Sequence, residues 1–515
     1  MKIVLVSLYL FKSISIRMLT AAIKKTPNQV FPIFFKEITP NSMPNPTDKE
    51  YLLFRNLIEE LRPDLIGISV NSTFFKHAKE LTKIVKSINE NIFIVWGGIH
   101  PTVAPEHSLN CADAICIGEG IYPMLELIEN LARADKANLE KIENIWIKKD
   151  NGEIIRNPVR NLESNLDNYP NPDWRDQNTF YIEKDCVYRN IPNDLIDKSY
   201  YIMSSFGCPF SCYFCCNDAL KKLYSGKGPY VRRRSVGRVI EELKMAKTNF
   251  PDLKVIHIVD DVFTFDGAWL SEFIKLYRKG INIPFSCYSQ PSLVKDEVIG
   301  MLSRAGLKSM TMGIQSGSER VREEVFNIKS YSNADIEAVS QYFKGKTVKP
   351  CYDLLLDNPF EVIEDKYKSL DLLLKFPRPF DLHQHSLTFF PGVELTQRAI
   401  KEGLIKNEFV ECEEQKSMFR WTAELDITRK PQDLFWDILF FMTRYPGIPK
   451  FLIRKFSRSK LIFNRPKIIY PLAMVQKFFD RIKNPQQAVD SLNRILKGYY
   501  FRRIILQRKN RFSCG

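Results

Sequence analysis

The first quarter of the chain alternates short apolar runs with longer segments whose apolar residues recur at helical spacing. Continuous apolar runs are typical of parallel strands that are buried on both faces. The runs that predict strands cover residues 2–8, 30–37, 65–70, 92–96 and 114–117, and the predicted helices cover residues 16–25, 48–61, 74–88 and 124–132. This order predicts an α/β domain with a doubly wound, Rossmann-like sheet over residues 1–140.

A second series of strand and helix patterns occupies residues 196–402. Strands are predicted over residues 200–205, 255–259, 285–288, 309–313, 349–355 and 382–387, and helices over 236–249, 267–279, 295–305, 319–325, 333–343 and 364–376. Six such units are what a partial (β/α)6 TIM-like barrel requires. The chemistry of such a barrel lies at the carboxyl ends of its strands.

Two stretches lack this regular alternation. Residues 141–195 have the composition of a connector, in which Asp150-Asn151-Gly152 predicts the turn of a hairpin. Residues 403–515 are predicted to form a basic, mainly helical C-terminal region with a basic helix over 484–503.

Length and composition limit the class of protein. A chain of 515 residues that is 44% hydrophobic can bury more than one core, and its length predicts two to four domains. Eleven cysteines in a chain this long do not indicate a secreted disulfide framework. Neither a signal peptide nor a membrane-spanning run is predicted. We therefore expect a cytoplasmic protein, with peripheral contact to the inner membrane face as the alternative.

The positive charge is concentrated at the C-terminal end. Residues 441–515 contain 18 Lys and Arg against two acidic residues, a net charge of +16, whereas the whole chain carries +15. Residues 1–440 therefore sum to about −1. A basic segment with interspersed aromatic residues is either a solvated face or a surface for anionic lipid. No recognition motif supports specific nucleic-acid binding.

The most specific pattern in the chain is G-C-P-F-S-C-Y-F-C-C, from Gly207 to Cys216. Its spacing, C-x3-C-x2-C, lets one loop present the thiolates of Cys208, Cys212 and Cys215 to one centre. Three soft ligands from one loop leave a coordination position open. The alternatives are a cluster of buried small hydrophobic residues and a zinc site completed by a distant ligand.

This pattern resembles the signature of the radical S-adenosylmethionine (SAM) enzymes. The resemblance implies that Cys208, Cys212 and Cys215 hold a [4Fe-4S] cluster and that the methionine end of SAM fills the unique iron. Cys216 lies outside the pattern, and we interpret it as structural.

Small-residue turns follow the strands of the first domain, where ligands of open α/β sheets bind. The order G-G-I-H-P-T, Pro105-Glu106 and I-G-E-G resembles the cobalamin-binding domain of one radical SAM subgroup, which includes methyltransferases. The resemblance implies a cobalamin site lined by Ser69, Ser72, Thr73, Gly97, Gly98, His100, Thr102, Gly118 and Glu119. A D-x-H-x-x-G motif is absent, so cobalt is expected to lack a protein histidine; His100 is the alternative ligand.

Polar residues follow the predicted strands of the second domain as well. D-D-x-F and G-I-Q-S-G-S-E resemble the SAM-contacting segments of the subgroup, which implies SAM contacts for Asp260, Asp261, Gln290, Gln315 and Ser316. The alternative is helix capping, which we expect for Ser318.

The resemblance as a whole implies a cobalamin-dependent radical SAM enzyme. Its expected reaction is methylation of an unactivated carbon by way of a 5′-deoxyadenosyl radical and methylcobalamin. The partners would be a small-molecule or lipid substrate and an external electron donor of the flavodoxin or ferredoxin type. No catalytic acid, base or nucleophile is predicted. A radical cyclase, rearrangement or oxidoreductase enzyme and a non-catalytic electron-transfer or sensor protein are the alternatives.

Overall fold

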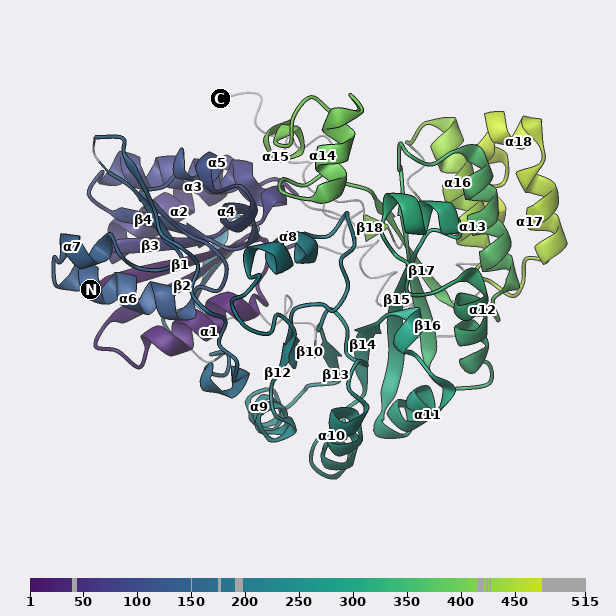
Figure 1. Ribbon diagram of the computed structural model, residues 1–515, viewed down its shortest axis with the longest axis horizontal. Coiled ribbons are helices and arrows are strands. Elements are labelled where there is room, and N and C mark those ends of the chain that lie inside the picture. The colour runs from purple at the N-terminus through teal and green to yellow at the C-terminus, as the bar shows by residue number, and fades with distance from the viewer. Residues whose placement is uncertain are drawn as a thin grey trace, which may run out of the picture. The chain divides into compact units, whose positions relative to one another are not determined.

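The computed structural model describes residues 1–38, 44–149, 151–174, 177–189, 198–414, 421–422, 425 and 428–474. The chain divides into two compact units, Met1–Glu424 and Leu425–Gly515. The first unit contains two large sheets, each with its own helices, and a two-stranded ribbon (Figure 1).

The first sheet has nine strands in the order β7-β6-β5-β4-β3-β1-β2-β8-β9. Five parallel strands form its centre: β1 (Lys2–Leu8), β2 (Gln29–Phe35), β3 (Leu65–Ser69), β4 (Phe93–Gly97) and β5 (Ala114–Cys116). The predicted connector supplies both edges, with the antiparallel hairpin of β6 (Ile145–Lys148) and β7 (Ile154–Arg156) on one side and β8 (Phe180–Glu183) and β9 (Cys186–Tyr188) on the other.

Helices cover both faces of this sheet because alternate strand residues point to opposite sides. Val4, Val6 and Ile68 belong to a core with α2 (Asp48–Leu61) and α3 (Phe75–Ile88). Ile3 and Leu5 belong to a second core with α1 (Ile14–Ile23) and α6 (Ile121–Ala132). The remaining short helices are η1 (Ser72–Phe74), α4 (Ile99–Val103), α5 (Pro105–Leu109), α7 (Lys136–Leu139) and η2 (Leu166–Asn168). The predicted doubly wound arrangement is confirmed.

The second sheet has seven strands in the order β10-β13-β14-β15-β16-β17-β18. The first six are parallel, and the open order confirms the partial barrel: β10 (Ser199–Ile202), β13 (Val255–Ile258), β14 (Phe285–Ser289), β15 (Leu307–Gln315), β16 (Lys349–Leu356) and β17 (Asp381–Ser386). A short antiparallel strand, β18 (Trp421–Thr422), extends the β17 edge.

Five predicted helices follow the strands in the expected order: α9 (Val236–Asn249), α10 (Gly267–Gly280), α11 (Asp296–Ala305), α12 (Asn333–Tyr342) and α13 (Ile363–Lys375). The structure adds four that were not predicted: α8 (Cys216–Leu223), η3 (Pro291–Leu293), α14 (Glu394–Lys401) and α15 (Val410–Glu414). The helix predicted over 319–325 is a single π turn, η4 (Val321–Val325). Strand β11 (Ser205–Phe206) comes before α8 in the chain, and β12 (Arg232–Arg233) comes after it. The two pair as a short antiparallel ribbon.

The described part of the second unit is helical. It contains α16 (Pro431–Met442), α17 (Lys450–Ser457), α18 (Lys460–Asn464) and η5 (Pro466–Ile468). The basic helix predicted over 484–503 lies outside the described residues. In the part of the chain that the structure describes, no helix is both long and apolar enough to cross a bilayer.

Candidate active site

The three cysteines of the motif lie on the loop that joins β11 to α8, and the local backbone requires the glycine before them. Gly207 adopts φ 85°, and a Cβ atom there would lie 2.4 Å from the carbonyl oxygen of Tyr230. Lys221 of α8 fixes the loop from one side, because its ammonium donates to the carbonyl oxygens of Pro209 and Phe210 at 3.1 and 2.8 Å. The loop is therefore held in one shape by its neighbours.

The three thiols share one electrostatic environment. Burial raises the pKa of Cys208 to about 11 and that of Cys212 to about 12, and the nearby Cys215 raises both further. A hydrogen bond from Cys216 has the opposite effect and lowers the pKa of Cys215 to about 7. Asn217 also donates to the Cys215 sulfur at 3.7 Å. These contacts give Cys216 and Asn217 roles beside the cluster loop that the spacing motif did not predict.

The donor set of the loop consists of three cysteine sulfurs. Soft thiolates are the ligands of iron–sulfur clusters, and a [4Fe-4S] cluster takes each thiolate on a separate iron. The donor set is therefore suited to the cluster that the motif implies.

The two adjacent aspartates after β13 have different surroundings. Asp260 is buried and accepts hydrogen bonds from the backbone and hydroxyl of Ser204 and from the Ser205 hydroxyl at 2.7 Å. Asp261 faces the cluster loop, since its charge raises the pKa of Cys208 and Cys215. Solvent reaches Asp261, but protein surrounds it on most sides and raises its own pKa. Asp260 thus fixes the junction between β10 and β11, whereas Asp261 lies toward the cysteine loop.

The other predicted SAM contacts lie at the carboxyl ends of the next two strands. Gln290 follows β14 and donates to the Ser330 hydroxyl at 3.0 Å. Gln315 is the last residue of β15, and its φ is 59°. The pairing register between β15 and β16 shifts at this point. Ser316 is buried, and its hydroxyl donates to the Glu361 carboxylate at 3.3 Å. All three therefore lie along one edge of the sheet.

Glu361 is a residue that the sequence analysis missed. Burial raises the pKa of its carboxyl to about 7. Its second oxygen, Oε2, is buried and has no hydrogen-bond partner in the structure. An unsatisfied carboxylate oxygen beside Ser316 suits an ammonium group, such as the α-amino group of SAM. No pattern could have singled it out, because it lies in a loop five residues after β16 ends.

A cavity of about 300 Å³ opens at the carboxyl ends of the central strands in the first domain. Its walls are mostly apolar and come from the strand ends, α1, α6 and the residues before the cluster loop, including Met203 and Phe206. Five of the predicted cobalamin residues line it: Ser69, Gly97, Gly98, Gly118 and Glu119. Gly118 adopts φ 73°, and a Cβ atom there would lie 1.8 Å from the Tyr224 hydroxyl. An apolar cavity edged by close backbone fits the nucleotide tail of cobalamin.

The other predicted cobalamin residues lie outside the lining of this cavity. His100 is fully buried; its Nδ1 lies 3.0 Å from the Ser72 hydroxyl and its Nε2 lies 3.2 Å from Nδ1 of His107. Burial lowers the His100 pKa to about 3. Thr102 donates to the Gly98 carbonyl at 2.8 Å and supports the turn, while the Thr73 amide donates to Asn71. Both nitrogens of His100 therefore contact protein groups rather than the cavity.

Glu119 connects the cavity to the cluster loop. Its carboxylate accepts hydrogen bonds from the buried Arg232 of β12 and, at 2.8 Å, from the Tyr169 hydroxyl. Its backbone amide donates to Tyr224 at 2.8 Å. Because β12 pairs with β11, which leads directly into the cysteine loop, Glu119 joins the two predicted cofactor sites. Arg232 and Tyr169 are further residues that spacing alone did not reveal as partners.

Two family profiles match separate parts of the chain. The B12 binding domain matches residues 41–128, and the Radical SAM superfamily matches residues 202–373. The two matches lie within the two sheet domains described above. They support the three cofactors that were expected, a [4Fe-4S] cluster, SAM and cobalamin.

Three curated relatives differ in named activity. An uncharacterized methyltransferase of Pyrococcus horikoshii is 28% identical and covers 68% of this chain and 72% of its own. The cytidylyl-2-hydroxyethylphosphonate methyltransferase of Streptomyces wedmorensis is 23% identical, with 77% of each chain covered. The anaerobic magnesium-protoporphyrin IX monomethyl ester cyclase of Rubrivivax gelatinosus is 25% identical over 52% of this chain and 46% of its own.

Two solved structures share the fold over most of the chain. The radical SAM methyltransferase TsrM from Kitasatospora setae, with cobalamin and a [4Fe-4S] cluster bound, has a TM-score of 0.60 at 16% identity and covers 78% of each chain. The cobalamin-dependent radical enzyme OxsB has a TM-score of 0.55 at 21% identity and covers 80% of this chain and 56% of its own. The fold, the cysteine loop and the two domain matches together identify the chain as a radical SAM enzyme with an N-terminal B12-binding domain.

Proposed function

We propose that the chain is a cobalamin-dependent methyltransferase that adds a methyl group to an unactivated carbon of a small-molecule or lipid substrate. The observation that carries this proposal is the adjacency of the two cofactor sites. Phe206 lines the cavity of the B12-binding domain, and Cys208 follows it by two residues. Hydrogen abstraction and methyl transfer would act on the same substrate carbon, so both cofactors must reach that carbon in one enclosed space. Two of the curated relatives are named methyltransferases, which supports the same reaction class.

The residues of this chain would hold and separate the reactants. When bound, the cluster and SAM supply hydrogen-atom abstraction, and cobalamin supplies the methyl group. Cys208, Cys212 and Cys215 would hold the cluster, and the unsatisfied Glu361 oxygen would accept a hydrogen bond from the ammonium group of SAM. Glu119, fixed by Arg232, would keep the wall of the cobalamin cavity against the cluster loop and exclude water. An external electron donor of flavodoxin or ferredoxin type would supply reducing electrons.

Isotope labelling tests the proposal. The anaerobically prepared chain, loaded with iron and cobalamin, is incubated with reductant, SAM carrying a labelled methyl group, and a metabolite extract from a strain that lacks the enzyme. We expect 5′-deoxyadenosine and a labelled product. Cys215→Ala should abolish both, whereas Cys186→Ala, at an exposed position on β9, should retain both.

The same assay separates the alternatives. A radical cyclase or rearrangement enzyme, which the relative named a cyclase favours, would form 5′-deoxyadenosine while no product gains the label. That result would remove the methyltransferase proposal. A non-catalytic electron-transfer or sensor protein would form neither product under reducing conditions.

A further inference from the structure

The inner face of the second sheet carries polar and titratable side chains in place of the usual packing residues. Alternate residues of β16 point in opposite directions. Tyr352 is buried on the helix side, where its ring packs against Phe376 and Phe380 at centroid distances of 4.6 and 5.6 Å. Cys351 and Asp353 therefore point to the inner face of the sheet. Barrel interiors are commonly filled by Val, Ile and Leu, so packing alone does not require these residues.

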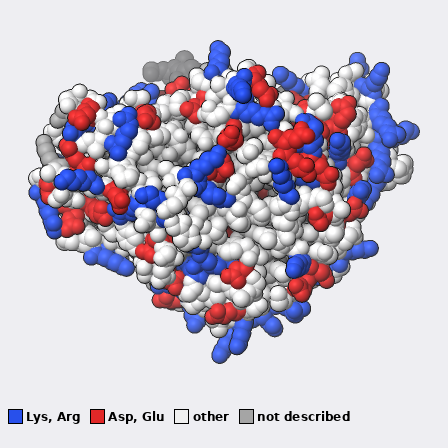
Figure 2. Space-filling view, in the orientation of Figure 1, with Lys and Arg blue, Asp and Glu red and all other residues white. Residues whose placement is uncertain are grey.

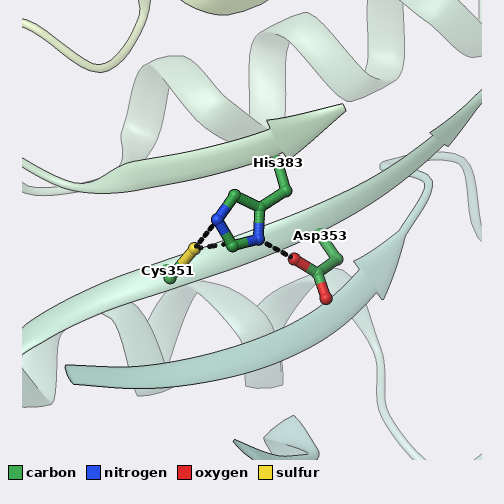
Figure 3. Close-up of side chains that lie close together, drawn as sticks. All are labelled: Cys351, Asp353 and His383. Carbon is green, nitrogen blue, oxygen red and sulfur yellow. Dashed lines mark hydrogen bonds and ion pairs between the residues drawn. The ribbon is translucent and has the colours of Figure 1, made fainter. Parts of the chain in front are cut away.

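Three of these side chains converge between β16 and β17. The Cys351 sulfur, a carboxylate oxygen of Asp353 and a ring nitrogen of His383 all lie within 4.8 Å of one another (Figure 3). Asp353 and His383 face each other across the parallel pair, with Oδ1 and Nδ1 2.8 Å apart. The sulfur lies 3.5 and 3.4 Å from the two ring nitrogens. The pairing register of β16 and β17 therefore brings these three donor atoms together.

The donor set selects a class of ion. Thiolate, imidazole and carboxylate together are typical ligands of zinc, whereas magnesium and calcium prefer oxygen. With Zn–S about 2.3 Å and Zn–N about 2.0 Å, a tetrahedral ion holds sulfur and nitrogen about 3.5 Å apart. The distance of 3.5 Å between the Cys351 sulfur and Nδ1 of His383 agrees with this separation, and Nδ1 is also the ring nitrogen that faces Oδ1 of Asp353.

A neighbouring histidine supports the carboxylate. His385 is two residues after His383 on the same face of β17, and its Nε2 lies 3.7 Å from Oδ1 of Asp353. Such outer contacts orient the ligands of metal sites. A nucleophilic thiol–imidazole pair is the competing use of these residues. Retention of a zinc ion by the parent chain would distinguish the metal site from such a pair.

We propose that Cys351, Asp353 and His383 bind one divalent ion of the zinc class on the inner face of the barrel, apart from the cysteine loop. Three protein ligands leave a fourth position, which is typical of sites that bind water or a donor atom of a substrate. The open position would face the barrel interior, where the Tyr288 side chain is 42% exposed. The ion would anchor a nitrogen, oxygen or sulfur group of the substrate inside the barrel.

Metal analysis of the iron-loaded, full-length chain tests this site. The protein is equilibrated anaerobically with limiting Zn²⁺, passed through a desalting column, and analysed for zinc and iron together. We expect about one zinc per chain, retained beside a full complement of iron. Cys351→Ser and Asp353→Asn should each lower the retained zinc at least tenfold without a loss of iron. Cys287→Ser, at a buried cysteine of β14, is the matched control and should keep the zinc.

Iron content separates loss of the ion from loss of the fold, because the cysteine loop belongs to the same domain. Zinc lost with iron retained supports the site. Zinc retained by Asp353→Asn, or absent from the parent chain after desalting, overturns the proposal. Co²⁺ in place of Zn²⁺ gives a second readout: a thiolate-to-cobalt absorption band in a difference spectrum should vanish in Cys351→Ser and persist in Cys287→Ser.

Discussion

At the scale of single residues, Gly207 determines whether the cysteine loop can form. Its φ is 85°, which residues other than glycine rarely adopt. A Cβ atom added there would lie 2.4 Å from the carbonyl oxygen of Tyr230, so there is no space for a side chain. We expect Gly207→Ala to cost about 2 kcal/mol or more in stability and to lower reconstituted iron severalfold. Gly226→Ala is the control, because Gly226 has φ 74° and nothing within 4 Å. Iron analysis and thermal unfolding of both variants measure the difference; equal iron in the two would contradict this prediction.

Glu361 gives a pH dependence with a defined sign. Its folded pKa of about 7 lies above the ordinary value of 4.5, so the folded state keeps a proton that the unfolded state has lost between these values. Stability therefore decreases as pH rises from about 4.5 to 7 and stays lowered above that, by at most about 3 kcal/mol. Glu361→Gln should be more stable than the parent at pH 8 and unchanged near pH 4.5. Denaturation midpoints at the two pH values measure this.

An exposed carboxylate provides the comparison for Glu361. Glu272→Gln on α10 removes a carboxylate from the surface, and the same pair of midpoints should show no change at either pH. A stabilisation of Glu361→Gln that is equal at pH 4.5 and pH 8 would rule out titration of this carboxyl as the cause.

The cysteine loop could be singled out from the sequence, whereas the residues around it could not, for a physical reason. Three thiolates within eight residues are a local pattern, so spacing alone reveals them. Glu361, Tyr169 and Arg232 act through contacts across 45 to 113 residues of chain, which no local pattern encodes. Asp260 and Asp261 are adjacent in sequence, yet their partners differ. Asp260 accepts hydrogen bonds from Ser204 and Ser205, whereas the charge of Asp261 acts on Cys208 of the cysteine loop.

At the scale of elements, a buried ion group attaches β8 to the first sheet. Lys36, just after β2, lies 2.8 Å from Glu50 of α2 and 3.3 Å from Glu183 of β8, and all three are buried. Lys36→Met would leave two buried carboxylates without their cation, so we expect a loss of about 3–5 kcal/mol. Lys83→Met breaks only the exposed pair with Glu80 and should cost less than about 1 kcal/mol. Urea unfolding of the two variants tests this; similar midpoints would contradict it.

Helices and strands were largely predictable where the spacing of their apolar residues was regular. The central strands of the first sheet are nearly continuous apolar runs, and α2 carries the capping box of Thr47 and Glu50, so both types were placed within a few residues. Strands β8 and β9 were not anticipated, because they are only four and three residues long and the segment is rich in turn-forming residues. The π turn η4 has the residues of a helix, but its backbone widens at Val321–Val325 next to the loop contact between Phe326 and Tyr213.

At the scale of the whole molecule, the second unit combines exposed apolar and basic side chains. Phe451, Leu461 and Ile468 are 69%, 62% and 55% exposed. Lys and Arg side chains gather over α17 and α18 (Figure 2). This combination is typical of a segment that lies on anionic lipid, which is one of the two alternatives that the composition of residues 441–515 leaves open. The distribution of charge along the chain was therefore readable from the sequence, whereas the exposure of these apolar residues needed the structure.

We predict that the full chain binds vesicles containing phosphatidylserine at low salt and not vesicles of phosphatidylcholine alone. Each basic residue near such a surface contributes about 1 kcal/mol, so Arg454→Glu with Lys455→Glu should weaken flotation with the vesicles more than tenfold. Truncation near residue 440 is a poor test, because it would cut α16 in its last turns. The control reverses the same number of charges on α3, with Lys76→Glu and Lys79→Glu. Because electrostatic attraction is screened within about 10 Å at 0.1 M salt, binding should also fall as salt rises. Flotation that is equal in the α17 and α3 variants would show that the basic surface of the second unit faces solvent only.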